Sequence, residues 1–569
     1  KCQYYMLVAE EEQTLHVEPN TVVIPFEMLP KSESGGSIYK SDRQYDPKAK
    51  TQVTSRFIML LIIAVLVVVG YFVAGKDVFN SEDGFLPANP LMHKDRASTY
   101  NVRVLPASLS DEDLDMLPKD SFSYLAMIDA GSSGCRAHVY RYGKLGTLSG
   151  PLYILPAHVS KKIKPGLSSF ANNPSGAGQS LEQLVEFVKE QVPEAFQAQT
   201  PIWLKATAGL RMVQAEEREA ILSSVRQFLG NKANSPFIFR PSYAAVIPGS
   251  EEGGFGWIAY NYLKKIIGPK AVDKSQTPYA VVEMGGASAQ VTQMARTNEE
   301  IAQIPAKYRF DFSIESESYV LYTNSYLGYG AEAARESVNK YFIANSKHHE
   351  VKTIPDPGSS GITLKDTCLN PGYKRAEKAQ RKGGSYAGPA GAYEVAGASS
   401  EGTCTAALHS LFQPVDTISD KCNDEGPHSF RCIFQPDFVK NSEHFLIFEN
   451  FYYVASAVGI ESVEPTAAGT FPLLTTPSKI KQAADHVCDM SLDSMNAHYP
   501  KDKSSKDDNV KWCFGASYAA SFLVDGLKLD DNKSVTIQQK VGASDVEWAL
   551  GAAYKEAAEF LKRTNLRPT

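Results

Sequence analysis

The pattern of apolar and polar residues predicts alternating strands and helices over much of the chain. Apolar runs typical of buried strands occur at 124–128, 202–206 and 279–282. Apolar residues at helical spacing predict amphipathic helices at 180–191 and 216–229. Strands that alternate with helices indicate an α/β fold with a largely buried sheet.

One uncharged run is long enough to cross a membrane. Residues 57–75 read FIMLLIIAVLVVVGYFVAG, about the length of a membrane-spanning helix. More Lys and Arg residues precede the run than follow it, so the tail 1–56 is expected to be cytoplasmic. The sequence thus predicts a single-pass type II protein, with its body on the other side of the membrane. A buried core helix is the alternative.

Two other stretches are predicted to lack regular structure. Residues 76–120 contain four prolines and the acidic patch 111–113, which are typical of a stalk or linker. Residues 350–403 are rich in Gly, Ser, Ala and Pro, particularly at 383–402, and predict a long loop or insertion. The body is therefore expected to begin near residue 121.

Two glycine-rich stretches have the same order of residues. DAGSSGCR at 129–136 and EMGGASAQ at 283–290 each follow a predicted strand and begin with an acid. After the first, residues 136–142 alternate as the returning strand of a hairpin does. Backbone N–H groups in such loops can surround an anion, and an acid at the strand end can hold a divalent cation. Two loops of this kind suggest a duplicated phosphate site that faces one cleft.

Charge and cysteine content narrow the class of protein. The net charge of −6 and the pI of about 6.1 argue against a nucleic-acid partner. Beyond the uncharged run, six cysteines remain when Cys135 in the first loop is set aside, an even number suited to an oxidising compartment. They allow fifteen connectivities, of which sequential pairing is the simplest: Cys368–Cys404, Cys422–Cys432 and Cys488–Cys513. Asn532 begins a glycosylation sequon on the same side.

Two further segments each allow two interpretations, one functional and one structural. Glu251 and Glu252 stand at the start of a predicted helix, where the helix dipole favours an ionised carboxylate. They could form a catalytic base or only a solvated helix cap. The aromatic segment 445–453 could pack in the core or stack on a ligand.

Taken in order, these motifs resemble the ecto-nucleoside triphosphate diphosphohydrolases, or apyrases. The resemblance is carried by residues 129–136, 206–211, 249–263, 283–290 and 513–526, with EWALG at 547–551. It covers about residues 121–560, and the first motif is most similar to the Golgi and plant branch. The resemblance implies a two-lobed actin/Hsp70-like (RNase H-like) α/β fold. Lobe I would span 121–248 with a returning helix at 546–569, and lobe II would span 249–545.

The resemblance also implies hydrolysis of the terminal phosphates of nucleoside tri- and diphosphates. Glu252 would be the general base, and Ser288 and Gln290 would hold the attacking water. Asp129 and Glu283 would position Ca²⁺ or Mg²⁺, through water. Tyr452 would stack on the base. The phosphate-binding residues would be Ser132, Ser133, Gly134, Thr207, Gly285, Gly286 and Ala287.

Three residues depart from the family pattern. Glu283 replaces a usual aspartate, Ala289 a usual threonine, and Cys135 a serine or threonine. The change at position 289 is expected to remove a hydroxyl beside Ser288 and Gln290. These changes motivate an alternative, an apyrase-fold surface protein with weak or no activity that is used for binding or assembly. An exopolyphosphatase is a second alternative, which the anchor and the lumenal cysteines disfavour. The sequence leaves the oligomeric state open, a homo-oligomer included.

Overall fold

The structure is a computed structural model of the chain. It describes residues 102–273, 275–345, 359–378, 392–400, 402–412, 429–430, 433–459, 472–498 and 508–565, which fall in one compact unit. The predicted tail, the membrane span 57–75 and the Cys422–Cys432 pair lie outside these residues. Among the helices described, none combines the length and the apolar character that a bilayer crossing requires.

The first sheet is built on the hairpin predicted around the first glycine-rich loop. Its strands follow the order β1-β3-β2-β6-β7, with β4 and β5 paired to β3. Strand β2 is antiparallel to β3 and parallel to β6. The bounds are β1 (Val104–Leu105), β2 (Ser123–Ala130), β3 (Cys135–Leu145), β4 (Leu152–Ile154), β5 (Val159–Ile163), β6 (Ile202–Ala206) and β7 (Ala244–Val246). The strands predicted at 124–128, 136–142 and 202–206 are confirmed.

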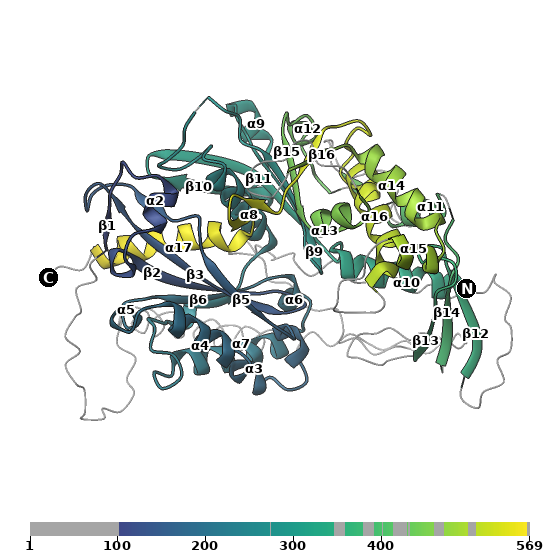
Figure 1. Cartoon of the computed structure of the whole chain (residues 1–569), viewed down its shortest axis with the longest axis horizontal. Helices are drawn as coiled ribbons and strands as arrows, with labels where there is room; N and C mark the ends of the chain where they lie inside the picture. The colour runs from purple at the N-terminus through teal and green to yellow at the C-terminus, as the bar shows by residue number, and fades with distance from the viewer. Residues whose placement is uncertain are drawn as a thin grey trace, which may run out of the picture. The chain divides into compact units, whose positions relative to one another are not determined.

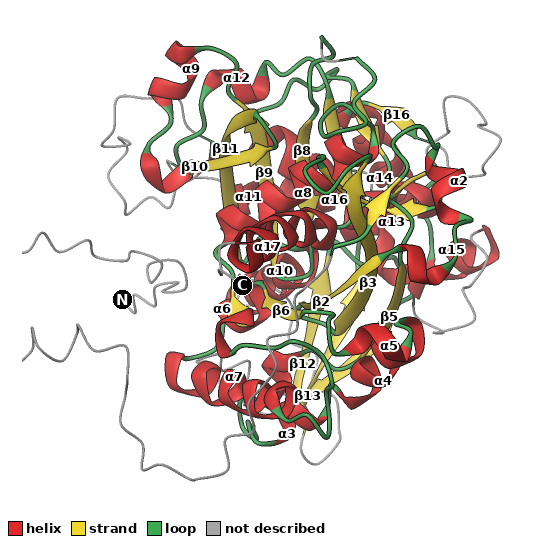
Figure 2. Ribbon diagram, turned by 90° about the vertical axis from the view of Figure 1, so that its left-hand side faces the viewer, coloured by secondary structure: helices red, strands yellow, loops and turns green. Residues whose placement is uncertain are grey.

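Helices cover both faces of this sheet (Figure 1). One face carries α3 (Gly176–Gln179), α4 (Glu182–Gln191) and α7 (Ala215–Gly230), and the other carries α8 (Gly249–Leu263) and α17 (Trp548–Asn565). Both predicted amphipathic helices are confirmed, with apolar residues of each in the core shared with β2. Helices α8 and α17 lie side by side in both views (Figure 2). Gly551 permits this contact, because a Cβ there would lie 2.2 Å from the Phe255 carbonyl oxygen.

The second sheet repeats the hairpin of the first. Its order is β10-β11-β9-β8-β15-β17-β16, with β8 antiparallel to β9 and parallel to β15. The strands are β8 (Ala280–Met284), β9 (Ser288–Met294), β10 (Arg309–Ile314), β11 (Glu317–Leu327), β15 (Phe445–Glu449), β16 (Leu473–Thr475) and β17 (Val535–Ile537). The helices around its core are α10 (Ala331–Asn345), α11 (Thr403–Phe412), α13 (Asn450–Ala457), α14 (Pro477–Asp489) and α16 (Lys511–Ser521).

Shorter elements complete the described fold. They are α2 (Asp111–Asp115), α5 (Glu194–Gln197), α6 (Ala208–Arg211), α9 (Asn298–Gln303), α12 (Asp437–Lys440), α15 (Leu492–His498), β18 (Lys540–Val541) and β19 (Ser544–Asp545). A π-helical turn, Phe522–Gly526, follows α16.

The stalk prediction is wrong over 102–120, because these residues belong to the body. Strand β1 pairs with the end of β3. Asp111, in the acidic patch of the supposed linker, forms ion pairs of 2.9 Å with both Lys265 and Lys270. A patch that resembles a solvated linker in sequence is therefore held by cations far along the chain.

The loop predicted over 350–403 is also wrong in part. A three-stranded sheet of order β12-β14-β13 lies within it, formed by β12 (Ser359–Asp366), β13 (Lys374–Lys378) and β14 (Ala392–Gly397). Its small residues suggested a loop, yet the backbone hydrogen bonds of a sheet form without bulky side chains. Residues 383–391 lie outside the described part.

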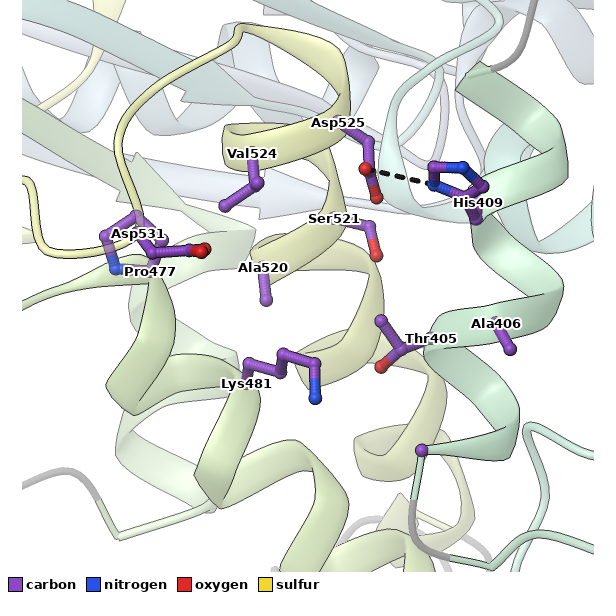
Figure 3. A pocket seen from close by; sticks show the side chains of 11 residues that line it. Thr405, Ala406, His409, Pro477, Lys481, Ala520, Ser521, Val524, Asp525 and Asp531 are labelled. Atoms are coloured by element: carbon purple, nitrogen blue, oxygen red, sulfur yellow. Dashed lines mark hydrogen bonds and ion pairs between the residues drawn. The ribbon is translucent and has the colours of Figure 1, made fainter.

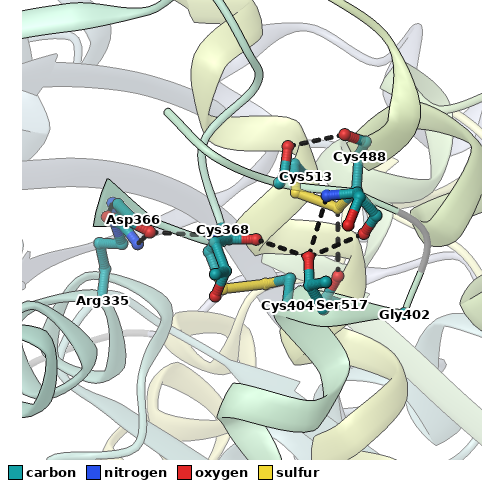
Figure 4. The surroundings of a disulfide bond; sticks show 12 residues. Arg335, Asp366, Cys368, Gly402, Cys404, Cys488, Cys513 and Ser517 are labelled. Atoms are coloured by element: carbon teal, nitrogen blue, oxygen red, sulfur yellow. Dashed lines mark hydrogen bonds and ion pairs between the residues drawn. A yellow bond between two sulfur atoms is a disulfide. The ribbon is translucent and has the colours of Figure 1, made fainter. Parts of the chain in front are cut away.

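Two of the three predicted disulfides are confirmed. Cys368–Cys404 and Cys488–Cys513 have Cα atoms 4.6 and 4.7 Å apart, and they lie next to each other (Figure 4). The second joins α14 to α16. Cys135 is a buried free thiol, as its exclusion from the pairing implied. Asn532 is exposed in a turn, where a glycan would be accessible.

Candidate active site

The two glycine-rich loops meet in one cleft. Residues 131–134 connect β2 to β3, and residues 285–287 connect β8 to β9. The loops approach closely, since a Cβ on Gly286 would lie 2.7 Å from the Ser132 hydroxyl. The cleft has a volume of about 120 Å³. Among its lining residues are the predicted Asp129, Ser132, Ser133, Gly134, Thr207, Glu252, Glu283, Gly285, Gly286, Ala287 and Ser288.

The three predicted catalytic side chains form one buried network. Glu252 lies in the first turn of α8 and is 6% exposed. The Gln290 amide donates to the Glu252 carboxylate at 3.2 Å and to the Ser288 hydroxyl at 2.6 Å. Gln290 does not line the cleft itself, but its position on β9 holds the two groups that do. This arrangement can orient a water molecule next to a carboxylate.

Arg211 is a member of this network that sequence reasoning missed. Its guanidinium donates to the Glu252 carboxylate at 2.5 Å and to the hydroxyls of Ser288 and Ser325 at 3.3 and 3.4 Å. The Arg211 and Glu252 side chains are only 4% and 8% exposed, so each depends on the other for charge compensation. Arg211 is the last residue of the motif 206–211, so the sequence contained a signal for its role. Nothing in the sequence indicated Ser325.

Asp129 and Glu283 form a concentration of buried negative charge. Burial, together with the charge of Glu252, raises the pKa of Asp129 to about 7 and the pKa of Glu283 well above its usual range. Asp129 Oδ1 and Glu283 Oε2 are buried without a hydrogen-bond partner. A divalent cation fits this pair, because it would compensate both charges, and its bound water would donate to both unpartnered oxygens.

Seven further residues line the cleft without having been predicted: Gly131, Arg136, Lys162, Ala208, Glu449, Glu547 and Trp548. Glu449 joins β15 to α13 with φ of 60° and ψ of −121°. Its N–H donates to the Gln539 side-chain oxygen at 3.0 Å, which helps to hold this left-handed backbone. Strained backbone of this kind tends to occur at functional sites. Sequence alone does not reveal a backbone angle, so Glu449 was missed.

Of the three residues that depart from the family pattern, two have side chains that face away from the cleft. Ala289 is fully buried in the core of the second sheet, because successive residues on β9 face opposite sides. Cys135 is buried in the first core, and burial raises the pKa of its thiol to about 12. The expectation that Ala289 removes a hydroxyl next to the water-holding pair is therefore wrong. Of the three, only Glu283 lines the cleft.

Tyr452 is not brought to this part of the cleft. It is partly buried against the second core, with its ring centroid 5.8 Å from that of Tyr453. The neighbouring Phe451 is buried in that core, which confirms the core-packing interpretation for this residue.

A larger cavity of about 360 Å³ lies between α11, α14 and α16 (Figure 3). None of the predicted site residues line it. Its rim carries a His409–Asp525 pair at 3.1 Å. The motifs, and not cavity size, therefore identify the candidate active site.

Comparisons with known proteins agree with the motifs. The profile of the GDA1/CD39 (nucleoside phosphatase) family matches residues 116–568. A guanosine-diphosphatase of Schizosaccharomyces pombe is 30% identical over 77% of this chain and 74% of its own. Probable apyrase 4 of Arabidopsis thaliana is 30% identical over 76% and 79%. The human nucleoside diphosphate phosphatase ENTPD5 is 28% identical over 76% and 86%.

A solved structure shows the same fold. The nucleoside triphosphate hydrolase of Neospora caninum aligns with a TM-score of 0.55 and 16% identity, over 78% of this chain and 93% of that chain. This likeness supports the α/β actin-like nucleotidase fold that the motifs implied.

Proposed function

Because the chain belongs to the GDA1/CD39 (nucleoside phosphatase) family, we propose that Glu252 is the general base with which it hydrolyses nucleoside di- and triphosphates. One observation carries the assignment. The Glu252 carboxylate lines the cleft between the two phosphate loops and is held there by Gln290 and Arg211. A base must be fixed within hydrogen-bond reach of the water that it deprotonates.

The two loops bind the terminal phosphates. In this proposal the backbone N–H groups of 132–134 and 285–287 surround the phosphate oxygens, and Thr207 adds a hydroxyl. Phosphoryl transfer to water needs alignment and charge stabilisation more than covalent help. Loops on opposite sides of one cleft supply both.

Ser288 and Gln290 orient the attacking water towards the phosphorus atom. Their mutual hydrogen bond of 2.6 Å holds both groups next to Glu252, which takes the proton as the water attacks. Arg211 fixes the position of the Glu252 carboxylate, and we assign it a positioning role.

Asp129 and Glu283 would hold the divalent cation, Ca²⁺ or Mg²⁺, through water. Such an ion neutralises charge on the phosphate oxygens. The unpartnered oxygens and raised pKa values of these two acids support the assignment.

Two of the relatives are a guanosine-diphosphatase and a nucleoside diphosphate phosphatase, which favours nucleoside diphosphates as substrates of this chain. We keep Tyr452 as the proposed base-stacking residue. Tyr453 is the more exposed ring of the pair at 47%, so Tyr453→Ala is the variant to compare with Tyr452→Ala. A larger rise of KM in Tyr453→Ala would move the role to that residue.

We further propose that residues 57–75 anchor the chain as a type II membrane protein, with the body in the Golgi lumen or outside the cell. The two disulfides in the body and the exposed Asn532 sequon support that side of the membrane.

The test is phosphate release from GDP, UDP, ADP and ATP, with Ca²⁺, with Mg²⁺ and with chelator. Glu252→Gln should lower the rate by about 100-fold or more. Glu251→Gln is the matched control, because the neighbouring Glu251 pairs with Lys555 at 3.3 Å and does not line the cleft. Equal rates for the two variants would overturn the role of Glu252. A folded wild-type chain that releases no phosphate would favour the binding or assembly alternative.

A further inference from the structure

A second group of possible metal ligands lies beside the cleft, which one of its members, Glu547, also lines. His138 of β3, His158 just before β5, and Glu547 just before α17 each offer one ligand atom, and these atoms lie within 4.8 Å of one another. None of the three belongs to the residues that the hydrolytic reaction uses.

Two members of this cluster, His138 and Glu547, have buried polar atoms without hydrogen bonds. His138 is fully buried, and Glu547 is 6% exposed. His138 Nδ1 lies 3.2 Å from Glu547 Oε2, yet the contact lacks hydrogen-bond geometry. Both ring nitrogens of His138 and Oε2 of Glu547 are therefore buried without a hydrogen bond, whereas Oε1 of Glu547 forms an ion pair with Arg136. Such groups are rare in folded proteins, and each calls for an explanation such as a bound ion.

Both imidazoles are prepared to act as neutral ligands. Burial lowers the pKa of His138 and of His158, so each ring keeps a nitrogen lone pair at neutral pH. His158 Nδ1 lies 3.3 Å from the Pro156 carbonyl oxygen. A histidine that donates one N–H to a carbonyl presents its other nitrogen to a metal, which is the usual outer-shell arrangement of metal-bound histidines.

We propose that His138, His158 and Glu547 bind a Zn²⁺-class transition-metal ion at a site separate from that of the hydrolytic cation. Two imidazoles and one carboxylate form a three-ligand zinc set, with water as the fourth ligand. Tetrahedral ligands at zinc-bond distances lie about 3.3 Å apart, close to the 3.2 Å between His138 and Glu547. Nitrogen ligands favour Zn²⁺ over Mg²⁺ or Ca²⁺, which prefer oxygen.

Glu547 connects this site to the cleft. Its Oε1 atom pairs with Arg136, which lines the cleft, while its Oε2 atom faces His138. One carboxylate oxygen is thus directed to Arg136 and the other to the ion. Since Glu547 also lines the cleft, an ion can reach the site from there.

The test uses the full chain, stripped with chelator, with Co²⁺ as a coloured substitute for Zn²⁺. Wild type should gain visible absorption bands of tetrahedral Co²⁺ at one equivalent, and Zn²⁺ should abolish them. Excess Mg²⁺ should leave them unchanged. Isothermal titration with Zn²⁺ should give the same stoichiometry.

His158→Ala is the informative variant, because His158 is only half-buried and its loss should not prevent folding. It should weaken Zn²⁺ binding at least about 100-fold, while circular dichroism and thermal melting stay unchanged. His409→Ala, which removes a histidine outside the cluster, should bind as wild type does. The proposal fails if wild type binds no Co²⁺ or Zn²⁺, if Mg²⁺ displaces the ion, or if His158→Ala binds as tightly as wild type.

Discussion

The Arg211–Glu252 pair gives the sharpest prediction for a single residue. Arg211→Met should destabilise the fold by about 3–5 kcal/mol, because it leaves the Glu252 carboxylate buried without its cation. It should also reduce phosphate release, since the base loses its fixed position. Chemical denaturation and turnover measure the two effects.

Arg563→Met is the control for this substitution. Arg563 pairs with Glu559 at the surface, and the side chains are 58% and 40% exposed. Its loss should cost less than about 1 kcal/mol. The double variant Arg211→Met with Glu252→Gln should recover part of the lost stability. No recovery would show that the cost does not come from the unpaired carboxylate.

Asp129 makes stability depend on pH when no divalent cation is bound. Its pKa is about 7 in the folded chain against an ordinary 3.8, so the folded chain holds the proton of this carboxyl more tightly than the unfolded chain does. The contribution of Asp129 to stability is therefore greatest below pH 3.8 and is lost as the pH rises through about 7. Asp129→Asn removes this loss, and it should be more stable than wild type by about 1–3 kcal/mol at pH 8 in chelator. Denaturation at pH 8 and at pH 5 tests the sign, since the gain must shrink at the lower pH.

For single residues, the sequence predicted the site positions of those that lie in local motifs. The loops, Glu252, Ser288 and Gln290 all lie at the cleft or in direct contact with it. Ser325 and Glu449 could not be predicted, because β11 and β15 come next to the motifs only through the pairing of distant strands. Ala289 was misjudged for a different reason, since its side chain faces the core.

Among the elements, the packing of α17 on α8 depends on a glycine. Gly551→Ala should destabilise the fold by about 1–3 kcal/mol or more, because its Cβ would lie 2.2 Å from a backbone oxygen of α8. In an unpacked helix the same change would stabilise by about 1 kcal/mol. Thermal denaturation distinguishes the two signs. Lys562→Ala, on the exposed face of α17, should have little effect.

Elements with strong periodicity were predictable, and those that depend on distant partners were not. Helices α4 and α7 and the β2–β3 hairpin agree with the apolar pattern. Strands β12 and β14 contain few large apolar residues, so their backbone pairing left no periodic signal. The short strand β1 exists because β3 extends far enough to pair with it.

For the molecule as a whole, the close approach of the two loops predicts that replacing Gly286 slows phosphate release. Gly286→Ala would place a Cβ 2.7 Å from the Ser132 hydroxyl and 2.9 Å from the Glu332 carboxylate. These flexible groups can shift, so stability should change by less than about 1 kcal/mol. Phosphate release should fall about 10- to 100-fold, because the two phosphate loops lose their alignment.

Steady-state kinetics measures the expected fall in the rate of phosphate release, and thermal melting measures the small change in stability. Gly230→Ala is the control, since its Cβ would make only an ordinary 3.8 Å contact at the end of α7. An unchanged rate in a folded Gly286→Ala chain would mean that the loops do not act together.

The pairing of β1 with β3 has a consequence for shortening the chain from its N-terminus. Loss of the residues before 121 would remove β1 and α2. Lys144 and Leu145 of β3 would then lack the strand with which they pair, and Lys265 and Lys270 would lack their ion-pair partner Asp111. An unpaired strand edge is a template for aggregation. A truncated chain that keeps this fold should therefore begin before Val104, and the solubility of chains shortened from the N-terminus would measure that limit.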